Sequence, residues 1–418
     1  MEELVLKNSA AKEELSMLEG TSFVFVSLQR INTDRESTST SIARELSKYY
    51  KVLYINPPID RKTLLSKKHD RYISSHIEEI RNKEKSLVKL NDNLWMYNPH
   101  SIMESINWVP STKIFSLLNR VNNQRFAREI QLAIDQLGLQ NFILINDKDM
   151  FRSFHLKEYL NPKYYIYLYR DYTLAYSYWK KHGTVLEPSL IRKADAVVCN
   201  SHGFKHLTEQ INPHSYFIGN GCNTVLFNGN HRWEKPRELQ AMNRPIVGYC
   251  GALTKRRLNI QLLVRIAELR PDWNLVLIGT ECEEFQKSAL HQLPNVHFLG
   301  QKNTKELPAY IQHFDVCINP QLINDLTNDN YPLKIDEYLA MGKPVVATAT
   351  KTMREIFYGY TYLCEDAESY IRNIEKAIAE DSEDWQEARI RFARTHSWEN
   401  VTREFIHAIR EIGARAPM

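Results

Sequence analysis

The chain has 418 residues, more than one ordinary hydrophobic core holds, so its length predicts two domains. A hydrophobic content of 43% with 25% charged residues is typical of a globular protein and excludes a disordered or fibrous chain. No stretch approaches the ~20 consecutive apolar residues that a membrane-spanning helix needs, and we expect no such helix.

The N-terminal residues and the cysteines bear on the cellular compartment. Glu2, Glu3, Glu13 and Glu14 stand where a signal peptide would carry a basic region and an apolar core. The six cysteines form no CxxC pair, and several lie inside apolar runs, as small buried hydrophobic residues do. We therefore expect a cytoplasmic protein with no structural zinc, no tightly bound metal and no other cofactor.

The charges are distributed unevenly along the chain. Lys and Arg outnumber Asp and Glu over residues 1–235, and the acidic residues outnumber the basic ones over residues 236–418. The basic residues are densest between Arg61 and Lys89. A basic face favours peripheral contact with anionic lipid or with a phosphorylated acceptor, whereas a solvated charged helix is the alternative for this segment. We expect no nucleic-acid partner.

The first half alternates short apolar runs with helix-length amphipathic stretches, the pattern of a parallel sheet covered by helices. Phe23–Leu28 predicts a strand, and a helix is expected near Ser37–Tyr49. Strand Val52–Asn56 stops at Pro57-Pro58. Further strands are predicted at Phe142–Asn146, Tyr164–Tyr169, Ala196–Asn200 and Ser215–Gly219.

The segment Asn228–Asn243 is polar, contains a proline and shows no sustained period, so we interpret it as a linker. The alternation then restarts, which predicts a second doubly wound α/β domain. Strands are expected at Ile246–Cys250, Trp273–Ile278, Val296–Leu299, Val316–Asn319 and Pro344–Thr348, with helices near Asn259–Leu269, Lys305–His313 and Pro332–Ala340.

Ligands of parallel sheets bind beyond the carboxyl ends of the strands, and this rule selects candidate residues in both halves. In the first half they are Asn146 with Asp147, and Arg170 with Asp171. In the second half three of the four strand ends run into a glycine, which lets backbone approach a ligand or makes a tight turn. These strand ends are Gly251, Gly279, Gly300 and Asn319-Pro320.

A basic loop follows Gly251. Lys255, Arg256 and Arg257 stand just before a predicted helix. Cations together with the free N–H groups of a helix start suit a diphosphate, and a basic surface cluster is the alternative.

The most informative stretch is Asn328–Thr348, NDNYPLKIDEYLAMGKPVVAT. Pro332 can open a helix that Gly342 ends. Lys334 and Glu337 are three residues apart and therefore share a helical face, and Asp329 stands eight residues before Glu337. A carboxylate at a strand-to-helix edge can accept hydrogen bonds from both hydroxyls of a ribose, whereas a solvated Lys–Glu pair is the alternative.

This stretch resembles the signature of GT-B glycosyltransferases of the group 1, or family 4, kind: an acidic residue, seven intervening residues, Glu, and then G-x-P-V. The resemblance extends to Val247–Gly251, Leu277–Gly279, His297–Gly300, Asn220-Gly221 with Phe227, and His396–Trp398. It implies two Rossmann-like domains facing across a cleft, over residues 1–230 on the acceptor side and 231–395 on the donor side. Residues 396–418 would form a helix that crosses back onto the first domain.

By that resemblance Glu337 would hold the donor ribose and Asp329 would stand beside the transferred sugar. Lys255 and Arg256 would neutralise the departing diphosphate with support from Lys334, because fixed cations stabilise the charge that develops on the leaving nucleotide. Gly251, Gly279, Gly300 and Gln301 would complete the donor site, with the loop at Gln301 near the base.

The chain departs from the family pattern in two places. The leading acidic residue is usually Glu, and Asp329 is one methylene shorter. The glycine-rich loop that commonly follows the first strand is replaced by Ser27–Asp34, ahead of hydroxyl residues Ser37–Ser41 that suit a helix N-cap or an acceptor sugar. We expect acceptor-side residues at Gln29, Arg30, Asp147 and Asp171, where Asp171 is also a candidate capping residue. This N-terminal pattern, with Asn56–Arg61, resembles bacterial cell-surface polysaccharide transferases.

The main hypothesis is therefore transfer of a sugar from a nucleoside-diphosphate sugar to a glycan or lipid-linked acceptor, with retention of anomeric configuration by analogy. The alternatives are a sugar-nucleotide epimerase or hydrolase on the same fold, and a binding subunit without catalytic activity. A dehydrogenase is disfavoured, because no GxGxxG motif follows any predicted strand.

Overall fold

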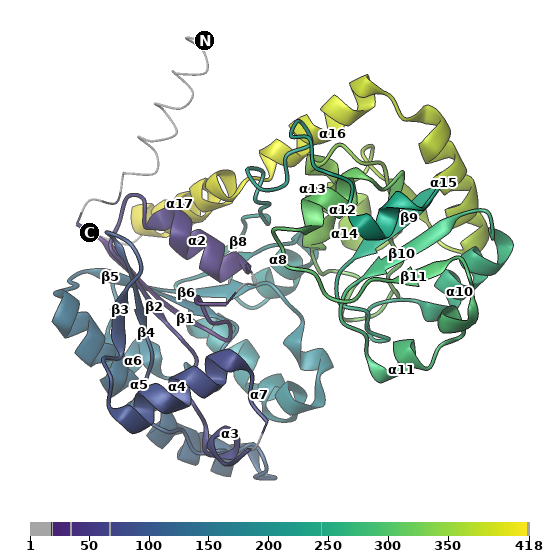
Figure 1. The fold of residues 1–418 in the computed structure, drawn as a ribbon. Coiled ribbons are helices and arrows are strands. Elements are labelled where there is room, and N and C mark those ends of the chain that lie inside the picture. Colours follow the sequence, from purple (N-terminus) through teal and green to yellow (C-terminus); the bar gives the residue numbers. More distant parts are fainter. Residues whose placement is uncertain (1–17, 19, 34–35, 67, 244, 416–418) are drawn as a thin grey trace. The chain divides into compact units, whose positions relative to one another are not determined.

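The computed structural model describes residues 18, 20–33, 36–66, 68–243 and 245–415. The four N-terminal glutamates and Asp34 discussed above lie outside these residues. Contacts divide the chain into two compact units, each a sheet covered by helices (Figure 1). The first contains Phe204–Ile218 and the residues before Ser201 and after Asn400, and the second contains Ser201–Gly203 and Gly219–Asn400. The second unit thus starts at Gly219 and ends at Asn400, apart from Ser201–Gly203, whereas the sequence places the boundaries at 230 and 395.

The first unit is built on an eight-stranded sheet of order β3-β4-β2-β1-β5-β6-β7-β8. All neighbouring strands are parallel except β3 and β4. Its strands are β1 (Ser22–Ser27), β2 (Val52–Ile55), β3 (Leu87–Lys89), β4 (Leu94–Tyr97), β5 (Phe142–Asp147), β6 (Tyr164–Tyr169), β7 (Ala196–Cys199) and β8 (Ser215–Phe217).

The central strands of this sheet are covered on both faces. Every residue of β1 and β5 is buried, which explains their nearly continuous apolar runs. The covering helices are α2 (Thr38–Leu46), α3 (Arg61–Leu65), α4 (Arg71–Asn82), α5 (Thr112–Leu137), α6 (Leu156–Leu160), η1 (Thr173–Ala175), α7 (Ser177–Lys193), α8 (His202–Glu209) and α17 (Trp398–Arg415). The hydroxyl run begins α2 as a capping box, in which the Ser37 side chain accepts from the Thr40 N–H.

The second unit is built on a six-stranded sheet of order β11-β10-β9-β12-β13-β14, in which all neighbours are parallel. Its strands are β9 (Ile246–Cys250), β10 (Asn274–Ile278), β11 (Val296–Phe298), β12 (Val316–Asn319), β13 (Val345–Thr348) and β14 (Tyr362–Cys364). Two apolar cores lie on the two faces, because Cys250 belongs to one and its neighbour Tyr249 to the other.

The second unit carries α9 (Arg237–Gln240), α10 (Ile260–Leu269), α11 (Glu283–Gln286), η2 (Ala289–Gln292), α12 (Leu307–Gln312), α13 (Leu333–Ala340), α14 (Lys351–Ile356), α15 (Ala367–Glu380) and α16 (Glu383–Thr395). Pro332 precedes α13 as its N-cap, and Gly342 follows it with a φ of 74°. Residues 228–243, interpreted above as a linker, contain α9 and bury Leu239 in one core of this unit.

The cysteines are small buried residues for the most part, as their place in apolar runs predicts. All six cysteines are free thiols, and five of them are buried. No helix among the described residues is long and apolar enough to span a membrane. The described residues also contain no cluster of three or more His, Cys, Asp or Glu side chains that could hold a metal ion.

Candidate functional site

Three glycines bring the loops after β9, β10 and β11 together at the carboxyl edge of the second sheet. The Gly251 N–H donates to the Ile278 carbonyl at 2.8 Å, and the Gly279 N–H donates to the Gly300 carbonyl at 2.9 Å. A Cβ on Gly279 would lie 1.9 Å from the Gly251 carbonyl oxygen. With φ values of 149° and 153°, Gly251 and Gly279 form a backbone floor that a side chain would obstruct.

Lys334 lies over this floor. Its ammonium nitrogen donates to the Tyr249 hydroxyl at 2.8 Å and lies 4.5 Å from the centre of the Tyr249 ring. A Cβ on Gly251 would lie 2.9 Å from the same nitrogen. The lysine predicted to support the diphosphate is therefore in contact with the first of the predicted glycines, held there by a tyrosine.

Helix α13 presents two faces of different character. Ile335, Asp336 and Tyr338 are buried, while Lys334 and Glu337 are half-buried and share the other face, as their spacing predicts. The electrostatic influence of Glu337 and Lys334 reaches the Cys250 thiol, whose pKa is raised well above its usual value chiefly by burial. Both side chains therefore stand beside the end of β9.

The buried face of α13 is fixed at two points. The Cys250 N–H donates to the Tyr338 hydroxyl at 2.8 Å. The Asp336 carboxylate accepts from the Tyr331 hydroxyl at 2.7 Å and contacts the His396 Nδ1 at 2.8 Å. Burial raises the pKa of Asp336. These contacts set the rotation of α13 and thereby the direction of Lys334 and Glu337.

The basic loop differs from the expectation in its relation to the helix. Helix α10 begins at Ile260, and its N-cap Asn259 already accepts from the Leu262 N–H. Lys255 and Arg256 are exposed in a turn ahead of it, and Lys255 lies 3.4 Å from Glu284. One N–H group of the helix start is thus already capped, and the contact of Lys255 and Arg256 with a diphosphate stays a prediction.

Gln301 and Asp329 occupy separate positions around the same edge. Gln301 accepts from the Thr280 hydroxyl at 2.8 Å, so the loops after β10 and β11 are joined by side chains as well as backbone. Asp329 lies 3.5 Å from the Lys351 ammonium at the first residue of α14. Its role beside a transferred sugar stays a prediction.

The chemistry available at this edge is that of an anion site with a polar rim. Gly251 and Gly279 let the two loops pack closely, Lys334 supplies a positive charge beside Gly251, and Glu337 supplies a carboxylate on the same helical face. A nucleoside diphosphate offers matching groups, namely phosphate oxygens for the cation and ribose hydroxyls for the carboxylate.

The carboxyl edge of the first sheet has a different content. Asp147, at the end of β5, is fully buried and accepts from Ser27 and Ser39 at 2.6 Å each and from Arg170 at 2.6 and 3.1 Å. Arg170 also donates to Asp171 at 2.8 Å. Because the Asp147 oxygens are already engaged, a direct contact with an acceptor would require these bonds to break.

Asp171 remains the more accessible carboxylate of this group, with about a third of its side chain exposed. The capping alternative finds no support, because η1 has Tyr172 as its N-cap and no side-chain cap bond. The polar residues of this edge form one network, because the Tyr54 hydroxyl contacts Ser39 at 3.2 Å and donates to the Gln29 carbonyl.

Arg30, which the sequence predicts as an acceptor-side residue, is buried. Its Nη2 donates to the Pro57 carbonyl at 3.2 Å and to His76 Nδ1 at 2.9 Å, whereas its Nη1 has no hydrogen-bond partner among the described residues. Burial lowers the pKa of Arg30 to about 10. Since arginine only donates, His76 carries its proton on Nε2, which bonds to the Pro99 carbonyl.

The comparisons with known proteins agree with the arrangement at the second sheet. Residues 244–380 match the family described as glycosyl transferases, group 1. The second unit is a group 1 glycosyltransferase domain. The matched range contains the glycine floor, the basic loop and the stretch from Asn328 to Thr348, and the resemblance stated from the sequence is confirmed for this domain.

One curated relative matches a part of the chain. TuaH of Bacillus subtilis, provisionally named a teichuronic acid biosynthesis glycosyltransferase, is 26% identical over 230 residues. The match spans 53% of this chain and 58% of the relative, so it covers little more than half of either protein.

Solved structures of low sequence identity share the fold over nearly the whole chain. Sucrose-phosphate synthase from Thermosynechococcus elongatus has a TM-score of 0.68 and 15% identity, with 95% of this chain and 100% of that chain covered. Anabaena Alr3699/HepE in complex with UDP has a TM-score of 0.62 and 15% identity, with 94% and 99% covered. These likenesses confirm the predicted GT-B class of two parallel-sheet α/β domains.

Several residues that shape the glycosyltransferase domain and the first unit could not be predicted from the sequence. Tyr249, which holds Lys334, is one strand residue among several, and only its place two residues before Gly251 could have marked it. Lys148 follows the predicted strand end at Asp147, but its left-handed backbone (φ 58°) and its buried ion pair with Glu187 depend on a helix 39 residues later.

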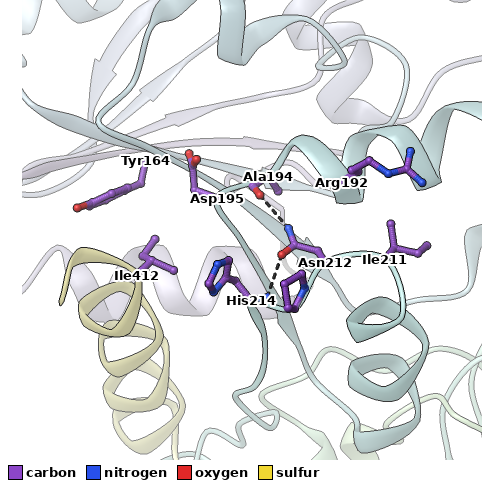
Figure 2. A pocket seen from close by; sticks show the side chains of 9 residues that line it. Tyr164, Arg192, Ala194, Asp195, Ile211, Asn212, His214 and Ile412 are labelled. Carbon is purple, nitrogen blue, oxygen red and sulfur yellow. Dashed lines mark hydrogen bonds between the residues drawn. The ribbon is translucent and has the colours of Figure 1, made fainter. Parts of the chain in front are cut away.

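A pocket of about 450 Å³ lies beside β6, β7 and β8 in the first unit (Figure 2). It opens near the amino ends of these strands, where Tyr164, Asp195 and His214 come together with Ile412 of α17. Asp195 accepts from Lys157 and from the Tyr165 N–H at 2.7 Å each, and His214 Nδ1 has no partner among the described residues. None of the predicted site residues lines this pocket.

Proposed function

We propose that the protein transfers a sugar from a nucleoside-diphosphate sugar to a glycan or lipid-linked acceptor in cell-surface polysaccharide biosynthesis. The observation that carries the proposal is the position of Lys334 and Glu337 over the Gly251–Gly279 floor, inside a domain of the group 1 family. The name of the relative TuaH supports the biosynthetic context, and the UDP bound to Alr3699/HepE makes UDP the first nucleotide to test.

In the proposed step the bond between the anomeric carbon and the β-phosphate oxygen breaks, and the leaving diphosphate keeps the electron pair. The acceptor oxygen forms the new bond to the anomeric carbon, and its proton passes to an oxygen of the departing diphosphate. Lys334 would stabilise the charge that develops on the diphosphate, with Lys255 and Arg256 as further candidates, and Glu337 would hold the ribose. Retention of configuration and independence from a metal ion are part of the proposal.

The acceptor side of the proposal rests on the first sheet. Asp171 is its most accessible carboxylate and is held by Arg170 at 2.8 Å. The buried Arg30 has an Nη1 donor with no hydrogen-bond partner among the described residues, and the charges of Asp70, Arg152 and Glu79 act on its guanidinium. A phosphorylated acceptor would meet an unsatisfied charged donor there.

The test is a thermal-shift screen of the wild type and Glu337→Ala against UDP, GDP, ADP, CMP and dTDP, with and without magnesium. We expect one nucleotide to raise the Tm of the wild type at millimolar concentration, and the shift to fall by more than half in the variant because the ribose contact is lost. Glu355→Ala, on the short helix α14 outside the predicted site, is the control and should keep the full shift.

The alternatives separate in the same assay followed by product analysis. A shift in Tm without turnover of the sugar nucleotide would favour the binding subunit. Turnover to an epimer or a free sugar in the absence of any acceptor would favour the epimerase or hydrolase. No shift with any nucleotide would contradict the donor site itself.

A further inference from the structure

Helix α5 of the first unit has apolar side chains on two faces: it buries Phe115, Phe126, Ala127, Ile130, Ala133 and Ile134 in the core, and its first half also carries an apolar row on the outside. Its buried face carries Asn119, Asn122 and Asn123, whose amides donate to the backbone carbonyls of Phe151 and Glu104 at 2.7 to 2.9 Å. Its outward face carries Ile114, Leu117, Leu118 and Val121, and Leu117 is 65% exposed. We refer to these four residues as the α5 stripe.

The α5 stripe has the spacing of an amphipathic helix that buries its apolar face in something outside the molecule. The four residues are spaced i, i+3, i+4 and i+7 and therefore form one continuous row on the helix. Single exposed apolar side chains are common on protein surfaces. A contiguous exposed row is less common, and packing inside the unit does not require it, because the buried asparagines on the other side of the helix already have hydrogen-bond partners. The row is thus a candidate docking surface.

The charges that α5 itself carries along the stripe are of one sign. No Asp or Glu occurs between Thr112 and Arg128. Lys113, Arg120, Arg125 and Arg128 are exposed along the same stretch. Arg125 lies 3.5 Å from Glu104, which also pairs with Arg61. The surface is therefore apolar along its centre and basic at its flanks. It complements a partner with an apolar interior and a negatively charged surface.

The loop before α5 extends the surface. Trp108 is 76% exposed, and its backbone carbonyl accepts from the Lys181 ammonium at 2.9 Å. On the other side, the Lys62 N–H donates to the Ser105 hydroxyl at 2.9 Å, which brings the exposed Leu65 of α3 to the same loop. An exposed tryptophan beside lysines is typical of side chains at the boundary between lipid headgroups and acyl chains.

We propose that the α5 stripe, with Trp108 and the basic residues beside it, docks the protein on the surface of an anionic lipid bilayer. Helix α5 (Figure 1) then lies in the plane of the interface, its apolar row enters the acyl boundary, and Lys113 and Arg120 contact the headgroups. A second copy of the chain is disfavoured as the occupant, because a two-fold contact would place these cations against each other.

This inference rests on α5 and not on the donor site, so it stands or falls independently of the proposed transferase activity. It assigns the membrane contact to Trp108 and Ile114–Val121 rather than to the basic segment Arg61–Lys89 that the sequence singles out. A lipid-linked acceptor would be presented at such a surface.

The test is co-sedimentation with sucrose-loaded vesicles of phosphatidylglycerol and phosphatidylcholine in equal amounts, and with vesicles of phosphatidylcholine alone. The variant Leu117→Ser with Val121→Ser removes two exposed side chains of the stripe. The matched control, Val225→Ser with Leu269→Ser, removes two exposed aliphatic side chains of the second unit. A third variant, Lys113→Gln with Arg120→Gln, removes charge and keeps the apolar row.

We expect the wild type and the control to bind the anionic vesicles at low salt, and the stripe variant to bind about tenfold more weakly. The charge variant should also bind more weakly, and wild-type binding should fall as salt screens the headgroups. The stripe variant should keep the Tm of the wild type and its shift with nucleotide, because both side chains are exposed.

Equal binding of the stripe variant and the wild type would overturn the proposal, as would equal binding to the uncharged vesicles. Sedimentation equilibrium tests the remaining possibility, that a second copy of the chain binds to the α5 stripe. A wild-type dimer that the stripe variant converts to a monomer, with vesicle binding unchanged, would assign the surface to a second copy and overturn the lipid assignment.

Discussion

The carboxyl edges of the two sheets are built in opposite ways. The edge of the second sheet is bare backbone, with Gly251 and Gly279 beneath a single lysine that a tyrosine holds. The edge of the first sheet is filled by side chains, with Asp147 accepting four hydrogen bonds from Ser27, Ser39 and Arg170. The first arrangement presents backbone groups and one cation, and the second fixes a few protein groups in place.

This contrast explains why the edge of the second sheet could be predicted from the sequence more fully than the edge of the first. A nucleotide diphosphate is the same group in every donor, so backbone and a cation suffice to bind it, and such a site leaves glycines and a helix motif in the sequence. An acceptor differs between enzymes and must be met by side chains, whose partners come from distant parts of the chain.

The largest effect should come from breaking the filled edge. Asp147→Ala leaves the Arg170 guanidinium, of which 13% is exposed, without its main partner, and we expect a loss of about 3 to 5 kcal/mol in the free energy of unfolding. Asp171→Ala should cost no more than about 1 kcal/mol, because its carboxylate is better solvated. Urea unfolding of both variants measures the difference, and equal losses would contradict the anchoring role of Asp147.

A somewhat smaller effect should follow from filling the bare edge. In Gly279→Ala the new Cβ meets the Gly251 carbonyl oxygen at 1.9 Å, at a φ of 153° that favours glycine. We expect a cost of about 3 kcal/mol and the loss of the thermal shift with nucleotide. Gly300→Ala, with a φ of 66° and nothing within 4 Å, should cost about 1 kcal/mol. If both variants bound nucleotide like the wild type, the glycine floor would not be part of the donor site.

The smallest effect concerns the protonation of the buried His76 in the first unit. Burial, together with the charge of Arg30, lowers the pKa of His76 from 6.5 to about 4. The unfolded chain therefore binds more protons than the folded one between pH 4 and pH 6.5. The contribution of His76 to the free energy of unfolding is fully present above pH 6.5 and falls progressively down to pH 4.

We expect wild-type stability to fall by about 2 to 3 kcal/mol more than that of His76→Gln over this pH range. The glutamine oxygen can still accept from Arg30 but does not titrate. Urea unfolding at several pH values measures the two slopes, and parallel slopes would show that His76 is charged or solvated in the folded protein.

Much of the architecture could be predicted because parallel strands are buried on both faces and therefore appear as apolar runs. Tyr164–Tyr169, Ile246–Cys250 and Val316–Asn319 were predicted with the bounds that the structure has. Strand β3 was not predicted, because at the antiparallel edge it buries little and contains only three residues. Its partner β4 follows so closely that neither shows a sustained alternation.

The candidate site divides in the same way. The shared face of Lys334 and Glu337 and the turn glycines follow from local spacing, so the sequence predicts them. The burial of Arg30 by Pro57 and His76, the hydrogen bonds of Asp147 and the contact of Lys334 with Tyr249 join residues between 23 and 120 positions apart. Such contacts depend on tertiary packing, which no short pattern in one chain encodes.

The distribution of the thiols provides a chemical probe of the donor side. Of the six cysteines, five are buried and Cys282 alone is partly exposed. Its sulfur accepts from the Lys255 N–H at 3.4 Å, at the turn that carries the candidate diphosphate cations. A thiol-directed fluorophore should therefore attach to the native protein at this one position. Its emission would then report movement of the basic loop, with no cysteine having to be introduced or removed.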